Sequence, residues 1–387
     1  MTKMKPNKLL KGLSFVLFLF LFAGIGFLVG RLALSAAIAI PPTTVIVLAL
    51  LFIPLFFIVV GIHEAGHALA GVWVRFDFRM YVIGPFMWQK EQHAWKFSWN
   101  KNVNTFGGMV ICLPPDTHDL SRRFSIYAAG GPVASLVLTM LAFGISRLIF
   151  LFNDAGHTSL LTLQYFFVVM AFFSLIIFLV TSIPMHFGGF SSDGARVVRL
   201  LRGGERAEFE TLILKLIANS SSGQRPKLTN MEELQRAQVL ADKLNAPFGV
   251  YLQSFFHQAA FDRGEIEEAE KYLHNYIQQA EEIPAGIRNV VWLDAAFFYA
   301  YAKSDLTQAE YYWQQFKPTG MIPKAQIYAT EAAMAVLKNE TELALAKIEA
   351  SQREIPAMMD RGVGAALLDR LDYLRARCVN REVVAQF

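Results

Sequence analysis

The sequence predicts an all-α membrane protein, in which a multi-pass helix bundle with a small β element is followed by an α-helical solenoid. Hydrophobic residues make up 54% of the 387 residues and charged residues only 18%, which is too apolar for an ordinary soluble chain. The apolar residues are concentrated before about Pro184, whereas the chain from Arg196 onward is rich in Glu, Gln, Lys, Arg and Ala. We therefore expect a membrane-embedded domain over residues 1–200 and a helical domain over residues 205–387.

Four apolar stretches are long enough to cross a membrane. A bilayer core about 30 Å thick needs roughly 20 apolar residues in a helix. The stretches cover about residues 12–30, 43–73, 128–152 and 160–184. The first stretch has a second interpretation, because its basic start, its apolar run and the small residues 35–37 are typical of a cleavable signal peptide. Cleavage there would leave the orientation of the other spans unchanged.

The basic residues orient these spans. They cluster before the first span, between the second and third, and after the fourth, whereas the loops near Pro41 and Asp154 carry almost none. Cytosolic loops carry the excess of Lys and Arg. We therefore expect a multi-pass protein of a bacterial-type cell membrane, with both termini, residues 75–127 and the helical domain in the cytosol.

Charge and cysteine content exclude two classes of site. The net charge is only +4, and the sequence has no long Lys/Arg run with interleaved aromatic residues, so nucleic acid is not an expected partner. The only cysteines, Cys112 and Cys378, lie far apart in regions of different character. They predict neither a disulfide framework nor a cysteine-based zinc site.

A metal-binding pattern lies near the cytosolic end of the second span. Residues 61–67 read Gly-Ile-His-Glu-Ala-Gly-His, so His63 and His67 stand one helical turn apart on one face and can share Zn²⁺. Glu64 lies beside them and can take a proton from a water that zinc activates. The same pattern arises by chance on soluble helices, but ionisable groups within a span cost roughly 2.5 kcal/mol or more each when unpaired. A zinc site with Glu64 as catalytic base is therefore the better explanation.

A catalytic zinc usually has three protein ligands and a water, so a third ligand is needed. Asp193 is the expected third ligand, because the fourth span ends near Pro184 and the topology returns Asp193 to the side of the histidine pair. His186 is a rival, since it is an imidazole a few residues after the same span. Another alternative is a soluble-type zinc site that takes Glu91 as third ligand, which requires a helix around Glu91.

These motifs together resemble the site-2 protease family of intramembrane zinc metalloproteases. The resemblance rests on three segments and covers roughly residues 43–200. The segments are His63-Glu64-Ala65-Gly66-His67, Pro184 followed by Asp193-Gly194, and Gly130-Gly131-Pro132-Val133-Ala134-Ser135 at the start of the third span.

The resemblance implies that His63, His67 and Asp193 bind zinc and that Glu64 is the catalytic base. It also implies that the substrate is a transmembrane protein or peptide, cut within or at the edge of the lipid bilayer. The chain departs from the family pattern in places: Thr181 and Ser135 stand where the family often carries Asn, and the gap from Pro184 to Asp193 is longer than usual. The competing function is a catalytically inactive membrane scaffold that recruits partners through its helical repeats.

Short aromatic and β-branched runs between the second and third spans predict a small sheet near the active site. The runs cover about residues 80–88, 93–99 and 108–113. We expect one edge of this sheet to pair with an unwound segment of the substrate, with Gly107 and Gly108 as substrate-binding residues. The alternative is a sheet that only caps the bundle.

The helical domain resembles a degenerate tetratricopeptide-like solenoid. Three similar segments, 264–269, 304–309 and 339–344, are expected to begin helices. They follow one another at roughly 40 and 35 residues, near the tetratricopeptide period of about 34. Solenoids present concave surfaces, so we expect docking of a cytosolic protein or a substrate tail. The alternatives are support of the membrane part and self-association into a homo-oligomer.

Overall fold

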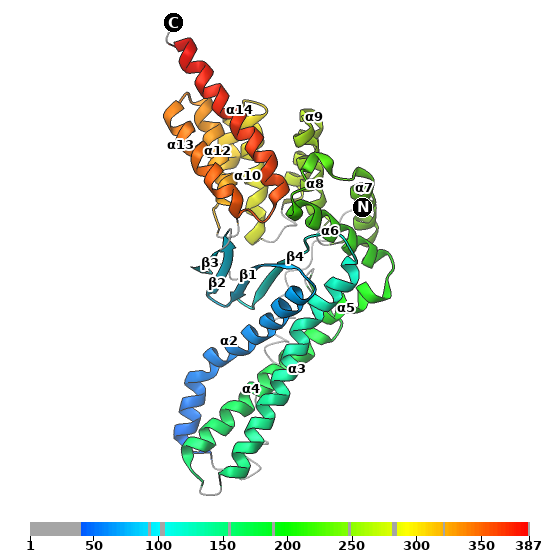
Figure 1. Ribbon diagram of the computed structural model, residues 1–387, viewed down its shortest axis with the longest axis vertical. Coiled ribbons are helices and arrows are strands. Elements are labelled where there is room, and N and C mark those ends of the chain that lie inside the picture. Colours follow the sequence, from blue (N-terminus) through cyan, green and yellow to red (C-terminus); the bar gives the residue numbers. More distant parts are fainter. Residues whose placement is uncertain are drawn as a thin grey trace. The chain divides into compact units, whose positions relative to one another are not determined.

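The computed structural model describes residues 40–91, 94–100, 105–153, 156–187, 190–246, 249–280, 285–319 and 322–385. Three of its helices are long and apolar enough to cross a membrane: α2 (Pro42–Trp73), α3 (Leu120–Phe152) and α4 (Thr158–Ser182) (Figure 1). They contain most of the last three predicted stretches. The first predicted stretch, 12–30, lies outside the described residues.

Helix α3 begins at Leu120, whereas the sequence predicted its start near residue 128. Residues 120–127 read Leu-Ser-Arg-Arg-Phe-Ser-Ile-Tyr. The adjacent arginines exclude this segment from an apolar span, but nothing in it breaks a helix. The helix therefore continues beyond its apolar part.

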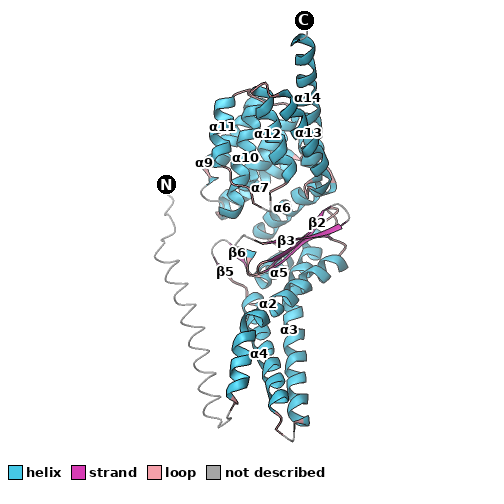
Figure 2. Cartoon of the chain, turned by 90° about the vertical axis from the view of Figure 1, so that its left-hand side faces the viewer, coloured by secondary structure: helices cyan, strands magenta, loops and turns pink. Residues whose placement is uncertain are grey.

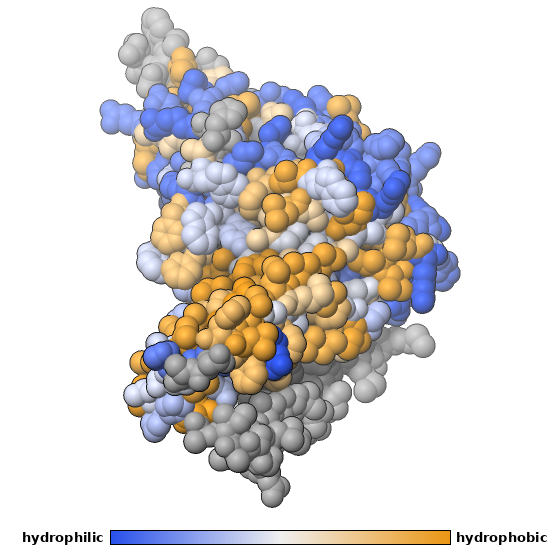
Figure 3. Space-filling model, turned by 60° about the horizontal axis from the view of Figure 1, so that its bottom comes forward, coloured by the Kyte–Doolittle hydropathy of each residue, from blue (hydrophilic) through white to orange (hydrophobic). Residues whose placement is uncertain are grey.

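Large apolar side chains of these helices are exposed. Leu50 is 74% exposed, Leu69 73% and Phe152 80%. Figure 3 shows broad apolar areas on one face of the molecule. Exposed apolar patches of this extent mark contact with a membrane or a partner, and here they belong to the helices that could span a bilayer.

Four antiparallel strands form the small sheet (magenta in Figure 2), in the order β3-β2-β1-β4. They are β1 (Asp77–Ile83), β2 (Phe86–Glu91), β3 (Ala94–Trp99) and β4 (Met109–Leu113). The predicted single run 80–88 is wrong, because it joins the end of β1 to the start of β2. Gly84 turns the chain there with φ +52°, and Ile83 pairs with Phe86 across the turn.

The two faces of the sheet differ. One face carries Met80, Val82 and Met87, which are buried. The opposite face carries mostly aromatic residues, and it packs beside α2, where the Tyr81 hydroxyl donates a hydrogen bond to the Gly61 carbonyl. An apolar hollow of about 390 Å³ lies between this face and α2, lined by Ala65, Ala68, Leu69, Phe78, Tyr81, Trp88 and Trp95.

After α4, the described chain forms a short hairpin followed by helices. Strands β5 (His186–Phe187) and β6 (Phe190–Ser191) connect α4 to α5. The helices are α5 (Asp193–Arg202), α6 (Glu205–Ser222), η2 (Pro226–Leu228), α7 (Met231–Leu244), α8 (Tyr251–Arg263), α9 (Ile266–Gln278), α10 (Ala285–Tyr301), α11 (Leu306–Gln315), α12 (Lys324–Leu337), α13 (Thr341–Glu354), η4 (Ile355–Ala357) and α14 (Arg361–Ala385).

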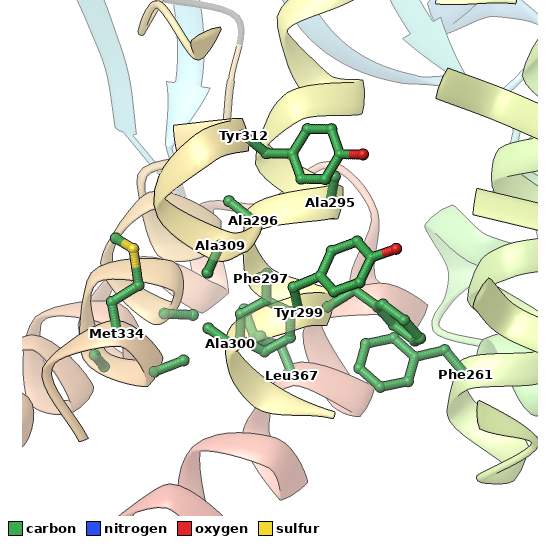
Figure 4. Close-up of a cluster of buried hydrophobic side chains, with 14 of the residues drawn as sticks. Phe261, Ala295, Ala296, Phe297, Tyr299, Ala300, Ala309, Tyr312, Met334 and Leu367 are labelled. Atoms are coloured by element: carbon green, nitrogen blue, oxygen red, sulfur yellow. The ribbon is translucent and has the colours of Figure 1, made fainter. Parts of the chain in front are cut away.

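The three predicted helix starts are confirmed. Helices α9, α11 and α13 begin at Ile266, Leu306 and Thr341, inside the three similar segments. Each packs against the helix before it, α8, α10 and α12 respectively. Their shared core is built of aromatic rings and alanines, among them Tyr299 and Ala309 (Figure 4). Phe298 and Ala309 are fully buried. Small residues opposite large ones let neighbouring helices pack without voids.

Candidate metal centre

The two histidines of the 61–67 motif lie near the C-terminal end of α2. His63 and His67 are 6% and 7% exposed, and their rings meet edge to face with centroids 4.9 Å apart. Their Nε2 atoms are 3.3 Å apart. Because residues four apart share a helix face, both side chains present a nitrogen to the same point.

Asp193 reaches this point because the chain turns back after α4. The Ser192 side chain caps α5, and its hydroxyl also donates a hydrogen bond to the Ile183 carbonyl at 2.7 Å. Gly194 then lies against the end of α4, where an added Cβ would overlap the Ser182 carbonyl oxygen. Glycine is therefore required after the aspartate, and Asp193 is held in the first turn of α5.

The three side chains fit one metal ion. Asp193 Oδ2 lies 3.5 Å from His63 Nε2 and 3.4 Å from His67 Nε2. Ligand atoms about 2.1 Å from one zinc ion in tetrahedral geometry would be about 3.4 Å apart. The three measured separations agree with this value, so the predicted ligand set converges on one point.

The other ring nitrogen of each histidine is also held. His67 Nδ1 donates a hydrogen bond to the Tyr127 carbonyl at 2.9 Å, and a carbonyl can only accept. Its Nε2 therefore keeps a free lone pair for a metal. His63 Nδ1 lies 2.9 Å from the Ser135 hydroxyl, and the Ser174 hydroxyl donates to the Ser135 carbonyl at 2.7 Å. Such partners orient metal-binding imidazoles.

Glycines of α3 make room for the centre. An added Cβ on Gly130 would overlap the Gly66 carbonyl, so α2 and α3 meet backbone to backbone. On Gly131, an added Cβ would overlap His67 Nε2 and lie 2.7 Å from His63 Nε2. The missing side chain at this position leaves open the space next to both ligand nitrogens.

Glu64 lies beside the ligands and below the start of β4. It is 8% exposed. Gly108 has φ +100°, and an added Cβ there would lie 2.5 Å from Glu64 Oε1. Gly107 has nothing within 4 Å of the same position. Gly108 thus lies over the predicted catalytic carboxylate and Gly107 beside open space, while their contact with a substrate stays a prediction.

The histidine pair controls the charge of Asp193. Burial alone would raise the pKa of Asp193, but protonated His63 and His67 would donate hydrogen bonds to it, and these bonds and the imidazolium charges lower the pKa below its usual range. The carboxylate is therefore ionised at neutral pH, as a metal ligand must be.

The two rival ligands have different outcomes. Glu91 ends strand β2, so the alternative that required a helix around it is wrong. His186 lies in β5, and its side chain falls outside the described part of the structure. Among the residues that the structure describes, His63, His67 and Asp193 form the group that could hold a metal ion.

Sequence reasoning missed the residues that support the ligands. Ser135 was noted only as a departure within a glycine motif, and the Tyr127 carbonyl and Ser174 had no sequence signal. The two adjacent glycines of that motif were the available indication, because they predict that α3 comes close to another helix.

A family model described as peptidase family M50 matches residues 51–262, which is more than half of the chain and includes all four site residues. None of the curated proteins matches the chain, and no solved structure does.

Proposed function

The chain belongs to peptidase family M50, the family of site-2 proteases, and from this premise we propose that it is an intramembrane zinc endopeptidase. Membership makes it a membrane metalloprotease. The proposal adds that the metal is zinc and that the substrates are membrane proteins. It further adds that the bonds cut lie within the bilayer or at its edge.

One observation carries the proposal. The three ligand atoms stand 3.3–3.5 Å apart, as a tetrahedral zinc requires, and the carboxylate of Glu64 is buried next to them. A zinc ion bound there would supply Lewis-acid activation of water. An inactive scaffold would need neither the matched separations nor the buried carboxylate.

Glu64 is the side chain that would transfer the proton. Glu64 takes a proton from the attacking water and later gives it to the leaving amine, so the carboxylate returns to its starting state. His63 and His67 stay fixed by Ser135 and the Tyr127 carbonyl throughout. The chemistry therefore needs no movement of the ligands.

The surroundings of the centre suit an apolar substrate. The hollow between α2 and the sheet has only apolar and aromatic walls and opens beside the helix that carries Glu64. Peptide bonds of a transmembrane helix are hydrogen-bonded within the helix and must be unwound before attack. A hollow of this kind can receive apolar side chains of the unwound segment.

Strand β4 is a candidate template for that segment. In the described part of the chain it pairs only with β1, so it is an edge of the sheet, and Gly108 at its start lies over Glu64. A substrate strand added there would replace its lost helical bonds with main-chain bonds. A proline scan through the cleaved segment should then lower cleavage at alternate positions, because every second N–H faces the partner strand. Equal tolerance at all positions would exclude strand addition.

The charge distribution supports an orientation of the protein in the membrane, and the helix pairs of the helical domain support a partner. From the clusters of basic residues we infer that the metal centre faces the cytosol, with both termini and the helical domain on the same side. The helix pairs of that domain are those a tetratricopeptide-like solenoid would have. We propose that it docks a cytosolic segment of the substrate or of a regulator.

The proposal is tested by co-expressing the protein with a panel of tagged membrane proteins and following their cleavage. The parent should cut at least one of them, and Glu64→Gln should lower that cleavage by about 10²- to 10⁴-fold. Glu232→Gln, an exposed glutamate of α7, is the matched control and should cut normally. Cleavage by Glu64→Gln at the parent rate would refute the proposed mechanism.

A further inference from the structure

A cavity with both polar and apolar walls lies inside the helical domain. Its volume is about 230 Å³, and its walls come from α6, α7, α8, α10, α12 and the start of α14. Sites for drug-sized ligands usually measure about 300–1,000 Å³. This cavity is therefore sized for a side chain or a small group.

A buried carboxylate, that of Asp294, borders the cavity. Asp294 of α10 is 8% exposed and borders the cavity. Among the residues that the structure describes, it makes no hydrogen bond or ion pair. Burial raises the pKa of Asp294 to about 7, although the Arg370 charge acts in the opposite direction. Buried carboxylates normally have partners, because an unpaired one is costly to ionise.

Of the three carboxyl groups on the cavity wall, Asp294 is the one without a partner among the described residues. Asp360 borders the same cavity, but it accepts hydrogen bonds from the Ser220 hydroxyl and from the Val363 amide at 2.9 Å. Glu233 is paired with Lys215 at 2.8 Å. Gln258, which also borders the cavity, has a buried Oε1 without a hydrogen-bond partner in the described part of the chain. Two acceptors on the cavity wall thus lack a donor among the residues that the structure describes.

The cavity favours a positive charge on an apolar stem. Its wall includes three carboxyl groups and no Lys, Arg or His among the described residues. Apolar side chains such as Leu216, Phe255 and Met358 form other parts of the wall. Lys and Arg side chains combine a methylene stem with a charged head, so they match this distribution of charge and apolar surface.

We propose that this cavity binds a Lys or Arg side chain from the cytosolic flank of the membrane-protein substrate, with Asp294 and Gln258 as its acceptors. The inference rests on the proposed function, which supplies the substrate class. The segments of membrane proteins next to the cytosolic side of a span are enriched in Lys and Arg. A cytosolic domain with an acidic cavity can therefore hold such a flank while the adjoining span enters the active site.

The test measures peptide binding to the full-length Glu64→Gln protein in detergent by fluorescence polarisation. The probes are short end-blocked Gly/Ser peptides that carry one central Arg, Lys, Gln or Glu. The Arg and Lys peptides should bind, and Asp294→Asn should weaken them by about 10- to 100-fold, since a hydrogen bond to a charged group contributes about 1.5–3 kcal/mol. Asp242→Asn, an exposed aspartate of α7, is the matched control and should bind like the parent.

The second variant, Gln258→Met, removes the other acceptor and should also weaken binding. Equal binding of the Arg and Glu peptides, or unchanged binding in Asp294→Asn, would overturn the proposal, and Asp294 would then be a structural partner of Arg370. Binding is measured without turnover, so the two proposals fail separately. Peptide binding without any protease activity would refute the proposed function alone, and normal proteolysis without peptide binding would refute only this site.

Discussion

The metal centre and the cavity of the helical domain both bury ionisable side chains, but they differ in how the side chains that would bind a ligand are held. At the centre, hydrogen bonds hold the second nitrogen of both imidazoles, and the ligand atoms converge to 3.3–3.5 Å. In the cavity, Asp294 is buried with no bonding partner among the described residues. The difference indicates a centre organised before its ligand arrives and a cavity whose carboxylate depends on a ligand for its partner.

The largest expected effect comes from filling the space beside the ligand nitrogens. Gly131→Ala should lower zinc affinity by more than about 100-fold, because the new methyl group would occupy the space next to both Nε2 atoms. The two imidazoles cannot move aside, since Ser135 and the Tyr127 carbonyl hold them. Zinc retained after dialysis against a chelator measures this.

Gly144→Ala is its matched control. Gly144 lies on the same helix, and an added Cβ there meets nothing within 4 Å. Alanine is a better helix former than glycine by about 1 kcal/mol, so this variant should keep its zinc and its fold. Full zinc retention by Gly131→Ala would show that the ligands can move to accommodate an added methyl group, so the centre is not held as tightly as its hydrogen bonds indicate.

Because Asp294 has no partner among the described residues, the free energy of unfolding should depend on pH. The folded-state pKa of Asp294, about 7, lies above its unfolded value. The fold disfavours the charged form of Asp294, so the free energy of unfolding falls as pH rises from the unfolded pKa, about 4, to the folded pKa, about 7. Asp294→Asn should thus gain stability over the parent between pH 5 and pH 8, by at most about 3 kcal/mol.

Thermal unfolding of both proteins at the two pH values measures this gain. The groups that border the same cavities or act on Asp294 through charge are the same in both proteins: Glu233, His257, Tyr276, Asp360 and Arg370. Their contributions therefore cancel in the difference. A difference independent of pH would mean that Asp294 is stabilised in its charged form even without a ligand.

The smallest expected effect concerns the support of one imidazole. Ser135→Ala removes the hydroxyl that orients His63 and should weaken zinc binding by about 10- to 100-fold, as loss of such partners usually does. Ser135→Thr keeps the hydroxyl and should restore most of the affinity. Thr139→Ala removes a hydroxyl one turn further along α3 that donates to the backbone carbonyl of Ser135 and not to an imidazole in the described structure, so it serves as control. Equal affinity in all three variants would remove Ser135 from the centre.

The parts of the molecule that depend on local sequence could be predicted, and the parts that depend on tertiary approach could not. The 63–67 motif fixes two ligands within one helical turn, and the starts of α9, α11 and α13 follow from local helix signals. Asp193 required a topology argument, since it is far from the histidines in sequence. The turn at Gly84 was missed because aromatic and β-branched residues continue on both sides of it.

The residues that support the ligands, and the buried carboxylate of Asp294, could not be predicted from the sequence because both depend on tertiary packing. Ser135 supports His63 only because glycines let α2 and α3 meet. Asp294 follows Trp292-Leu293 and precedes Ala295-Ala296, and this apolar setting is consistent with burial. Whether a buried carboxylate has a partner depends on several helices at once, and no local pattern records it.

The three-ligand centre is tested most directly by the zinc content of Asp193→Asn after dialysis against a chelator, measured beside Asp242→Asn and Glu64→Gln. If Asp193 completes the ligand set, the parent and these two comparison variants should keep a single zinc ion per chain. Asp193→Asn should then lose most of its zinc. Zinc retained by Asp193→Asn at the parent level would contradict the three-ligand centre.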